Sequence, residues 1–303
     1  MRQFFNASHL KLYQEVAEDE CRQRILALPD RGRTDLISEI AFPIAWRVNA
    51  AILGIEPKDF SLQLRNWTDS VARLTDLQPS FISGEQGLMA IAALSGYFSR
   101  LLAQPSSPGQ PGLIQQLAED LRDGGVGETD AMSTLIFMFA VGHSSTVNLI
   151  GNTILTLLRH PKEMALLSDP ALLEPALSEV LRFESPVQSV TRTALVDTKV
   201  GDTVIKRGQA VHLIIAAANR DPEKFSDPDR FDIHRKAAPN LSFGLGIHTC
   251  IGLRLAKTTS LITLRYLLDR MRFELPKDDE PIWDEPYLGH GLKSLSVDFQ
   301  KRH

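Results

Sequence analysis

Apolar residues recur with helical spacing over most of this 303-residue chain. Within residues 11–28, Tyr13, Ala17, Cys21 and Ile25 fall on one stripe at intervals of four, which is typical of an amphipathic helix. Cys21 is therefore expected to be a packed, unreactive thiol. The same periodicity predicts further helices at residues 42–54, 58–77, 84–102, 113–122, 172–183 and 253–271.

The longest helical pattern runs from residue 128 to residue 159. Its length and apolar character predict a helix that crosses the whole molecule. In its middle, residues 141–146 read Val-Gly-His-Ser-Ser-Thr, a run of low helix propensity whose hydroxyl groups can bond back to carbonyls. We therefore expect the helix to be loosened at this point.

Short runs of strand-forming residues between turns predict a small β portion. Two such runs are expected between residues 283 and 299, and three others lie at residues 190–194, 203–205 and 211–215. The predicted fold class is therefore mainly α with small β sheets.

The remaining segments contain no obvious domain boundary. Residues 29–32 are predicted to form a turn and residues 34–37 to start a helix. The Pro- and Gly-rich residues 104–112 are predicted to form a surface loop. We therefore expect a single domain over residues 1–303.

Composition adds few constraints. The chain is 43% hydrophobic and 23% charged, with a formal net charge of −4, and this balance argues against a nucleic-acid binder. Two cysteines make a disulfide framework implausible and suit a reducing cytosol, so we expect a cytoplasmic protein. The start of the chain lacks the apolar core of a signal peptide, and the apolar residues 135–141 are too few to span a membrane.

A glycine-rich, mostly apolar run at residues 240–252 contains the second cysteine, Cys250, directly before a helical pattern. Its glycines, Gly244 and Gly246 among them, allow sharp turns and a close approach to a flat ligand. The free N–H groups of a helix N-terminus favour a thiolate at Cys250. Such a thiolate is a strong axial ligand for haem iron, and it promotes O–O cleavage. The alternative is a buried structural cysteine beside a glycine turn.

The spacing Phe-x-x-Gly-x-His-x-Cys-x-Gly, from Phe243 to Gly252, resembles the cysteine-ligand loop of the cytochrome P-450 superfamily. The resemblance implies a P-450-like fold that binds haem b (iron protoporphyrin IX). It implies that Cys250 ligates the iron, that Phe243 shields the sulfur and that His248 contacts a propionate. The two glycines between Phe243 and His248 belong to the same cofactor-binding loop.

The run at residues 141–146 resembles the P-450 helix that passes over the distal face of the haem. Family members carry there a small residue, Gly, any residue, an acid and then Thr. On this alignment Gly142 gives the haem and oxygen room to approach. Ser144 takes the place of the acid and Ser145 the place of the threonine, so both depart from the family pattern. Ser145, with Ser144 as a second candidate, is expected to handle protons at bound oxygen.

Glu179 and Arg182 are spaced i and i+3, so they lie on one face of a predicted helix and can pair. Alone this spacing is a weak signal. However, the pair precedes Cys250 in the same order as in the P-450 superfamily, and the Asp-Pro-Asp-Arg-Phe run at residues 227–231 lies between the pair and Cys250. The resemblance implies a buried network of Glu179, Arg182 and Arg230 that braces the cysteine loop.

Two arginines are further cofactor-binding candidates by resemblance. Arg192 corresponds to the family's strand arginine that binds a propionate; the alternative is an exposed strand arginine. Arg2 takes the place of an arginine on an early helix, so the fold is expected to lack its N-terminal portion. We therefore expect an unpaired edge on the sheet that contains residues 211–216, a more exposed haem, and self-association or a partner subunit that covers the gap.

The resemblance implies a haem-thiolate monooxygenase that inserts one oxygen atom from O2 into an apolar small molecule. Its electrons are expected from a ferredoxin or flavodoxin-like partner. Arg254 and Lys257 either form part of the docking face for this partner or belong to a merely solvated helix face. The predicted pocket residues are all apolar and indicate only an apolar substrate surface; they are Val141, Val187, Val190 and Leu292.

Two other functions stay open. The serine pair favours a haem-thiolate enzyme that uses peroxide, or that catalyses a non-oxygenating rearrangement or coupling. The short front end favours a non-catalytic P-450-like auxiliary protein, whereas the intact ligand loop opposes it.

Overall fold

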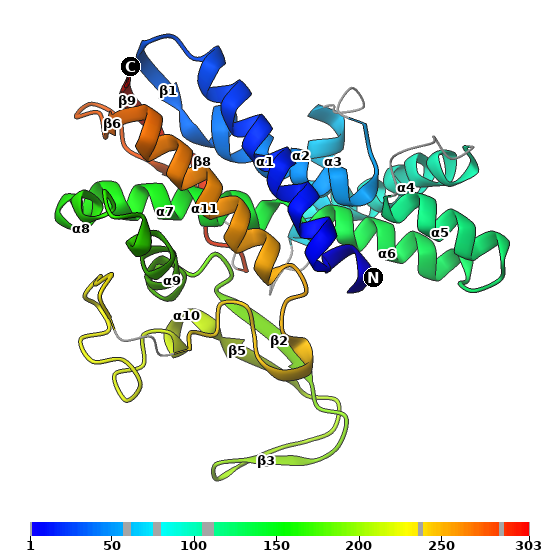
Figure 1. The fold of residues 1–303 in the computed structure, drawn as a ribbon. Coiled ribbons are helices and arrows are strands. Elements are labelled where there is room, and N and C mark those ends of the chain that lie inside the picture. The colour runs from blue at the N-terminus through cyan, green and yellow to red at the C-terminus, as the bar shows by residue number, and fades with distance from the viewer. Residues whose placement is uncertain are drawn as a thin grey trace.

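The computed structural model describes residues 2–56, 62–74, 80–104, 112–235, 239–284 and 288–302. Figure 1 shows most helices gathered on one side of the molecule, with β2, β5 and β3 extending from the other side. The architecture is mainly helical with small antiparallel sheets, which confirms the predicted fold class.

Most predicted helices are confirmed, with ends shifted by a few residues. The α-helices are α1 (Ala7–Ala27), α2 (Phe42–Leu53), α3 (Leu62–Arg73), α4 (Phe81–Ala103), α5 (Leu113–Arg122), α6 (Glu128–Val141), α7 (Ser144–Arg159), α8 (Pro161–Leu166), α9 (Leu173–Phe183), α10 (Ile215–Ala218) and α11 (Leu253–Arg270). Most of the predicted loop at residues 104–112 lies outside the described residues.

The predicted apolar stripe of α1 is buried along its whole length. It packs toward α2 and α11, and Figure 1 shows α1 and α11 lying side by side. Cys21, on this stripe, is 1% exposed, and burial raises the pKa of its thiol to about 12. The prediction of an inert Cys21 is therefore confirmed.

The strands form one three-stranded sheet, β1-β9-β6, and three two-stranded pairs, β2-β5, β3-β4 and β7-β8. Their bounds are β1 (Arg31–Asp35), β2 (Ser189–Thr193), β3 (Thr198–Val200), β4 (Thr203–Ile205), β5 (Ala210–Ile214), β6 (Met271–Glu274), β7 (Ile282–Trp283), β8 (Leu292–Ser294) and β9 (Ser296–Lys301).

Strand β1 replaces the second half of the turn predicted at residues 29–32, so that part of the prediction is wrong, whereas the helix start predicted at residues 34–37 is confirmed because helical backbone begins at Leu36. Its sequence, Arg-Gly-Arg-Thr-Asp, has no apolar alternation to signal a strand. The strand exists because β9 pairs with it over its whole length, with Arg31 opposite Gln300 and Asp35 opposite Ser296. Arg33 adds an ion pair of 2.8 Å to Asp298. A π-helix, Ile37–Ala41, then leads into α2.

Strand β5 pairs only with β2 within the described residues. Its other edge is therefore open, as predicted, and apolar side chains lie uncovered on it: Leu213 is 44% exposed and Ile214 is 49% exposed. The β3-β4 hairpin projects away from the helices (Figure 1).

Among the described residues, one stretch is long and apolar enough to cross a membrane by length and composition. It is residues Glu128–Arg159, which comprise α6 and α7. Within its apolar window, 61% is buried inside the protein. Figure 1 shows α6 and α7 following one another across the molecule among the other helices. The stretch therefore has the character of a core helix.

Candidate active site

The cysteine loop turns sharply at two glycines. Gly244 and Gly246 have φ values of +70° and +68°, a left-handed conformation that side-chain-bearing residues rarely adopt. The Cys250 N–H donates a 2.8 Å hydrogen bond to the Phe243 carbonyl and so closes the loop. Helix α11 begins at Leu253, so Cys250 lies directly before a helix N-terminus, as its sequence position predicts.

Two opposing effects act on the Cys250 thiol. Burial raises its pKa, while the backbone N–H groups of Gly252 and Leu253 donate to the sulfur and lower it; burial is the larger effect, so the net direction is upward. The predicted thiolate is therefore not favoured by the protein alone, because desolvation outweighs two amide donors. A coordinating metal cation removes the proton from such a thiol outright. With such a cation bound, the two amides would stabilise the thiolate.

The surface around this thiol fits a flat apolar group. Ile247 is 96% exposed, Leu245 75% and Ile251 42%, a dense set of uncovered large apolar side chains within one loop. A haem ligated by Cys250 would cover such side chains. The donor set also fits, because a thiol with two backbone donors suits a soft iron ligand.

The side chains of the two predicted propionate ligands, Arg192 and His248, are both exposed. Arg192 lies on β2 opposite Val211, and its guanidinium donates 2.8 Å to the neighbouring Thr191 carbonyl. His248 lies in the short helical turn Gly246–His248 of the cysteine loop. In the described part of the chain neither side chain has an acidic partner. Both are therefore available to an anionic ligand.

Two other predicted residues are placed less directly. Phe243 is half-buried and packs against a small cluster formed by Leu149, Leu177 and Leu181. Arg2 starts a short helical turn, Arg2–Phe5, and its side chain lies outside the described residues.

The long helix is broken where its sequence predicts a weak point. Helix α6 ends at Val141 and α7 begins at Ser144. Ser144 and Ser145 are half-buried in the first turn of α7. Neither hydroxyl has a hydrogen-bond partner among the described residues, so both can take part in proton transfer to a ligand.

The two residues between α6 and α7 face α2. A Cβ atom on Gly142 would lie 2.1 Å from Asn49 Oδ1, so packing against α2 requires a glycine here. His143 is 1% exposed, with its ring edge-on to Phe42 at 5.7 Å and to Trp46 at 5.6 Å. Burial lowers the pKa of His143 to about 4. His143 is thus a core residue, in agreement with its predicted place on a different helix face from Ser144.

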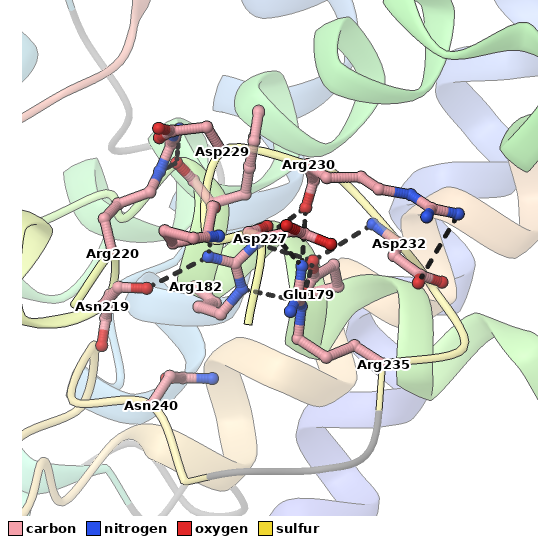
Figure 2. Close-up of polar contacts among 12 residues, drawn as sticks. Glu179, Arg182, Asn219, Arg220, Asp227, Asp229, Arg230, Asp232, Arg235 and Asn240 are labelled. Atoms are coloured by element: carbon pink, nitrogen blue, oxygen red, sulfur yellow. Dashed lines mark hydrogen bonds and ion pairs between the residues drawn. The ribbon is translucent and has the colours of Figure 1, made fainter. Parts of the chain in front are cut away.

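The Glu179–Arg182 pair is confirmed. Arg182 Nε and Nη2 donate 2.8 and 2.7 Å hydrogen bonds to the two carboxylate oxygens, and the two side chains are only 2% and 5% exposed. Figure 2 shows the guanidinium of Arg182 between Glu179 and Asn219.

The prediction that the Arg230 side chain is the third member of this network is wrong. The Arg230 side chain is 68% exposed and reaches Asp232 at 3.9 Å. Instead Arg235 Nε contacts Glu179 Oε1 at 3.0 Å and is 13% exposed (Figure 2). The chain turns so that the Arg230 carbonyl, not its side chain, faces Arg182, at 3.2 Å from Nη2.

Asn219 connects this network to the cysteine loop, and sequence reasoning missed it. It is fully buried, and its carbonyl accepts a 3.1 Å bond from Arg182 Nη1. Its side chain accepts 2.7 Å from the Leu241 N–H and donates 2.9 Å to Ser242 Oγ. The only local signal is an asparagine directly after an apolar run. The bracing role predicted for the network therefore depends on a residue far from the motif.

The predicted pocket residues differ in exposure. Val141 is 39% exposed, whereas Leu292 is 4% exposed within the main core. Two hollows of about 530 and 480 Å³ are bordered by α9 and α11, and none of the predicted site residues lines either one.

A cytochrome P450 family model matches residues 153–299. The chain is 38% identical over 272 residues to the biotin biosynthesis cytochrome P450 of Bacillus subtilis (strain 168), covering 89% of this chain and 68% of that protein. It is 37% identical to the cytochrome P450 monooxygenase PikC of Streptomyces venezuelae, covering 91% of this chain and 66% of PikC. The chain thus spans about two thirds of the length of these curated relatives.

Solved structures agree with these sequence relatives. P450BioI, in complex with an acyl carrier protein ligated to hexadec-9Z-enoic acid, superposes with a TM-score of 0.91 and 33% identity over 99% of this chain and 77% of that one. CxnD, described as a P450 enzyme for C–S bond formation, superposes with a TM-score of 0.89 and 30% identity over 98% of this chain and 73% of that one.

These comparisons confirm the resemblance: the chain belongs to the cytochrome P450 family. Membership places it among haem-iron oxidoreductases of the monooxygenase type.

Proposed function

We propose that this protein is a haem-thiolate monooxygenase that inserts one atom of O2 into an apolar small molecule, with electrons from a ferredoxin or flavodoxin-like partner. The observation that carries the proposal is the cysteine loop. There, a thiol with two backbone donors lies among uncovered apolar side chains, those of Leu245, Ile247 and Ile251. The group that fits is haem b, which supplies oxygen activation and oxygen-atom transfer when bound.

The chain's own residues bind and orient this group. Cys250 would ligate the iron, and the N–H groups of Gly252 and Leu253 would stabilise the charge of its thiolate. The Arg192 guanidinium and the His248 imidazole would contact the propionates of the haem. Phe243 shields the sulfur, while Gly244 and Gly246 shape the loop.

Ser145 Oγ would hold and pass a proton to bound oxygen, and Ser144 Oγ is the second candidate for this role. Both hydroxyls are free of protein partners in the described structure, which supports this role. Gly142, shortly before them in the chain, leaves room for the Asn49 side chain, which a Cβ atom at residue 142 would strike.

For the electron donor, Arg254 is the stronger docking candidate of the two basic residues at the start of α11. Arg254 is exposed and has no ion-pair partner among the described residues. Lys257 already lies 3.8 Å from Glu174 and is only 26% exposed.

The serine pair supports a second candidate function, a haem-thiolate enzyme that uses peroxide or catalyses a coupling reaction. Ser144 cannot act as a carboxylate, and Ser145 lacks the methyl group that restricts a threonine rotamer. A structural neighbour, CxnD, is described as forming a C–S bond. Product formation with peroxide alone, compared with product formation with NADH and redox partners, separates the two functions.

The haem-thiolate proposal is tested by the optical spectrum of the reduced protein under carbon monoxide. We expect a thiolate-type Soret band in the wild type, and its loss in Cys250→Ser because a serine hydroxyl is a far poorer ligand than a thiolate. Cys21→Ser is the matched control, since the other cysteine is buried against Thr263 in the core. An unchanged spectrum in Cys250→Ser, or the same loss in Cys21→Ser, would overturn the assignment.

A further inference from the structure

The break between α6 and α7 is held from outside by three residues of α2. Phe42, Trp46 and Asn49 are spaced i, i+4 and i+7, so they lie on one face of that helix. The two rings pack against His143, and Trp46 also packs against Phe139 at 5.2 Å. This face of α2 therefore packs against the residues at which the long helix is interrupted between α6 and α7.

Asn49 makes the polar contact of this face. Its Nδ2 donates a 3.1 Å hydrogen bond to the Phe139 carbonyl. Phe139 lies in the last turn of α6, where carbonyls lose their partners within the helix. His143 Nδ1 also lies 3.3 Å from this carbonyl, so two side chains serve as donors to it. The break is thus capped by side chains, and a continuous helix is not needed to satisfy that carbonyl.

The oxygen of the Asn49 amide determines which residue type can follow α6. Asn49 Oδ1 occupies the space that a side chain at Gly142 would fill, 2.1 Å from the Cβ position. This oxygen is buried and has no hydrogen-bond partner in the described structure, and His143 Nε2 is in the same state. A buried unpaired polar atom is costly, and an apolar side chain in place of Asn49 would avoid that cost. The hydrogen bond from Asn49 Nδ2 to the Phe139 carbonyl offsets the cost of the unpaired oxygen.

We infer that Asn49 is a positioning residue for the oxygen-handling turn. By capping Phe139 and filling the space beside Gly142, it sets where α7 starts, and hence where the hydroxyls of Ser144 and Ser145 lie. The inference rests on the proposed function only for its consequence in oxygen chemistry. The structural role of Asn49 stands without haem.

Hydrogen exchange measures the structural role in protein without haem. In Asn49→Leu, which keeps the branched shape of the side chain but removes the donor, we expect the amides of the first turn of α7 to exchange about tenfold faster. The matched control is Asn152→Leu, because Asn152 is another fully buried asparagine with an unpaired Oδ1. It lies in α7, but its Nδ2 donates to the carbonyls of Glu184 and His290. The control should leave exchange at residues 144–147 unchanged.

Peroxide release measures the consequence for oxygen chemistry in haem-loaded protein. With a plant-type ferredoxin, its reductase and NADPH, Asn49→Leu should release about twofold more peroxide per NADPH than the wild type, because displaced hydroxyls deliver protons less selectively. Asn49→Gln, which retains an amide donor, should fall between the two, and Asn152→Leu should match the wild type.

The outcomes separate the two levels. Unchanged exchange in Asn49→Leu, or an equal change in Asn152→Leu, overturns the inference whether or not the protein binds haem. Faster exchange without a change in peroxide yield overturns the positioning role. If Asn49→Leu does not fold, Gly142→Ala provides the second test, because its added methyl group must displace the Asn49 amide. Wild-type exchange in Gly142→Ala would also overturn the inference.

Discussion

Two serines at the start of α7 distinguish this chain from the family pattern that it otherwise resembles. On the predicted alignment Ser144 and Ser145 take the places of an acid and a threonine, and both hydroxyls are free of protein partners in the described structure. A serine hydroxyl has a less restricted rotamer than a threonine hydroxyl, and it cannot relay protons as a carboxylate does. Proton delivery is therefore expected to be poorly defined.

We predict that Ser144→Asp combined with Ser145→Thr raises the product formed per NADH consumed, by about twofold or more, because a carboxylate and a fixed hydroxyl direct protons better. The measurement uses the same substrate and redox partner for both proteins. Ser144→Asn combined with Ser145→Thr is the control, since asparagine matches aspartate in shape but does not ionise. High coupling in the wild type, or equal gains in both variants, would contradict the prediction.

A second residue-scale prediction separates two nearby arginines. Arg235→Ala removes a 13% exposed partner of the buried Glu179 carboxylate, so we expect it to lower the free energy of unfolding by about 3 kcal/mol. Arg230→Ala removes a 68% exposed side chain, so its effect should stay below about 1 kcal/mol. Chemical denaturation of both variants checks this. Equal losses would show that the assignment of Arg235 to the network is wrong.

At the scale of elements, the interface between α2 and the α6–α7 break contains a titratable group, His143, that burial keeps neutral. Burial, with a smaller contribution from Arg65 nearby, lowers the pKa of His143 to about 4, and the hydrogen bond to the Phe139 carbonyl only partly opposes this shift. In the unfolded chain histidine titrates near 6.5. Between these two values the unfolded state binds more protons than the folded state. The free energy of unfolding therefore falls as the pH falls from about 6.5 to about 4.

We predict that this group alone removes about 3 kcal/mol of stability over that pH range. His143→Phe keeps a ring between Phe42 and Trp46 but cannot be protonated, so its stability should fall less steeply with acid. Denaturation curves at several pH values, for wild type and variant, measure the difference. Parallel pH profiles would rule out His143 as the source.

The open edge of β5 carries the second element-scale prediction. Unpaired strand edges with uncovered apolar residues favour pairing with another chain, so we expect the protein to self-associate through this edge. A lysine in place of Leu213 should shift the protein toward monomer in sedimentation velocity. Val200→Lys is the control, because Val200 is 61% exposed on β3, away from that edge. A wild-type protein that stays monomeric at high concentration would refute the idea.

At the scale of the whole molecule, the cysteine loop is held in place by contacts that reach well beyond its motif. Asn240 Nδ2 donates to the Ser178 carbonyl of α9, and Ser242 Oγ donates to the Leu181 carbonyl. Asn219 ties the same loop to Arg182. The position of Cys250 thus depends on the packing of α9, although the two segments lie about seventy residues apart in the chain. The spacing of residues within each segment is enough to indicate that segment, but not the contact between the two.

The sequence by itself determined the features that depend on neighbours along the chain. The buried stripe of α1, the weak point after α6, the Glu179–Arg182 pair and the turns at Gly244 and Gly246 are all set by spacing or by local conformational preference. Only the tertiary structure decided the rest. Strand β1 forms because β9 pairs with it, and Arg235 replaces Arg230 because the chain turns between them. Asn219 and Asn49 acquire their roles through buried contacts with distant segments. Such contacts exist only after the chain has folded, so no local pattern specifies them.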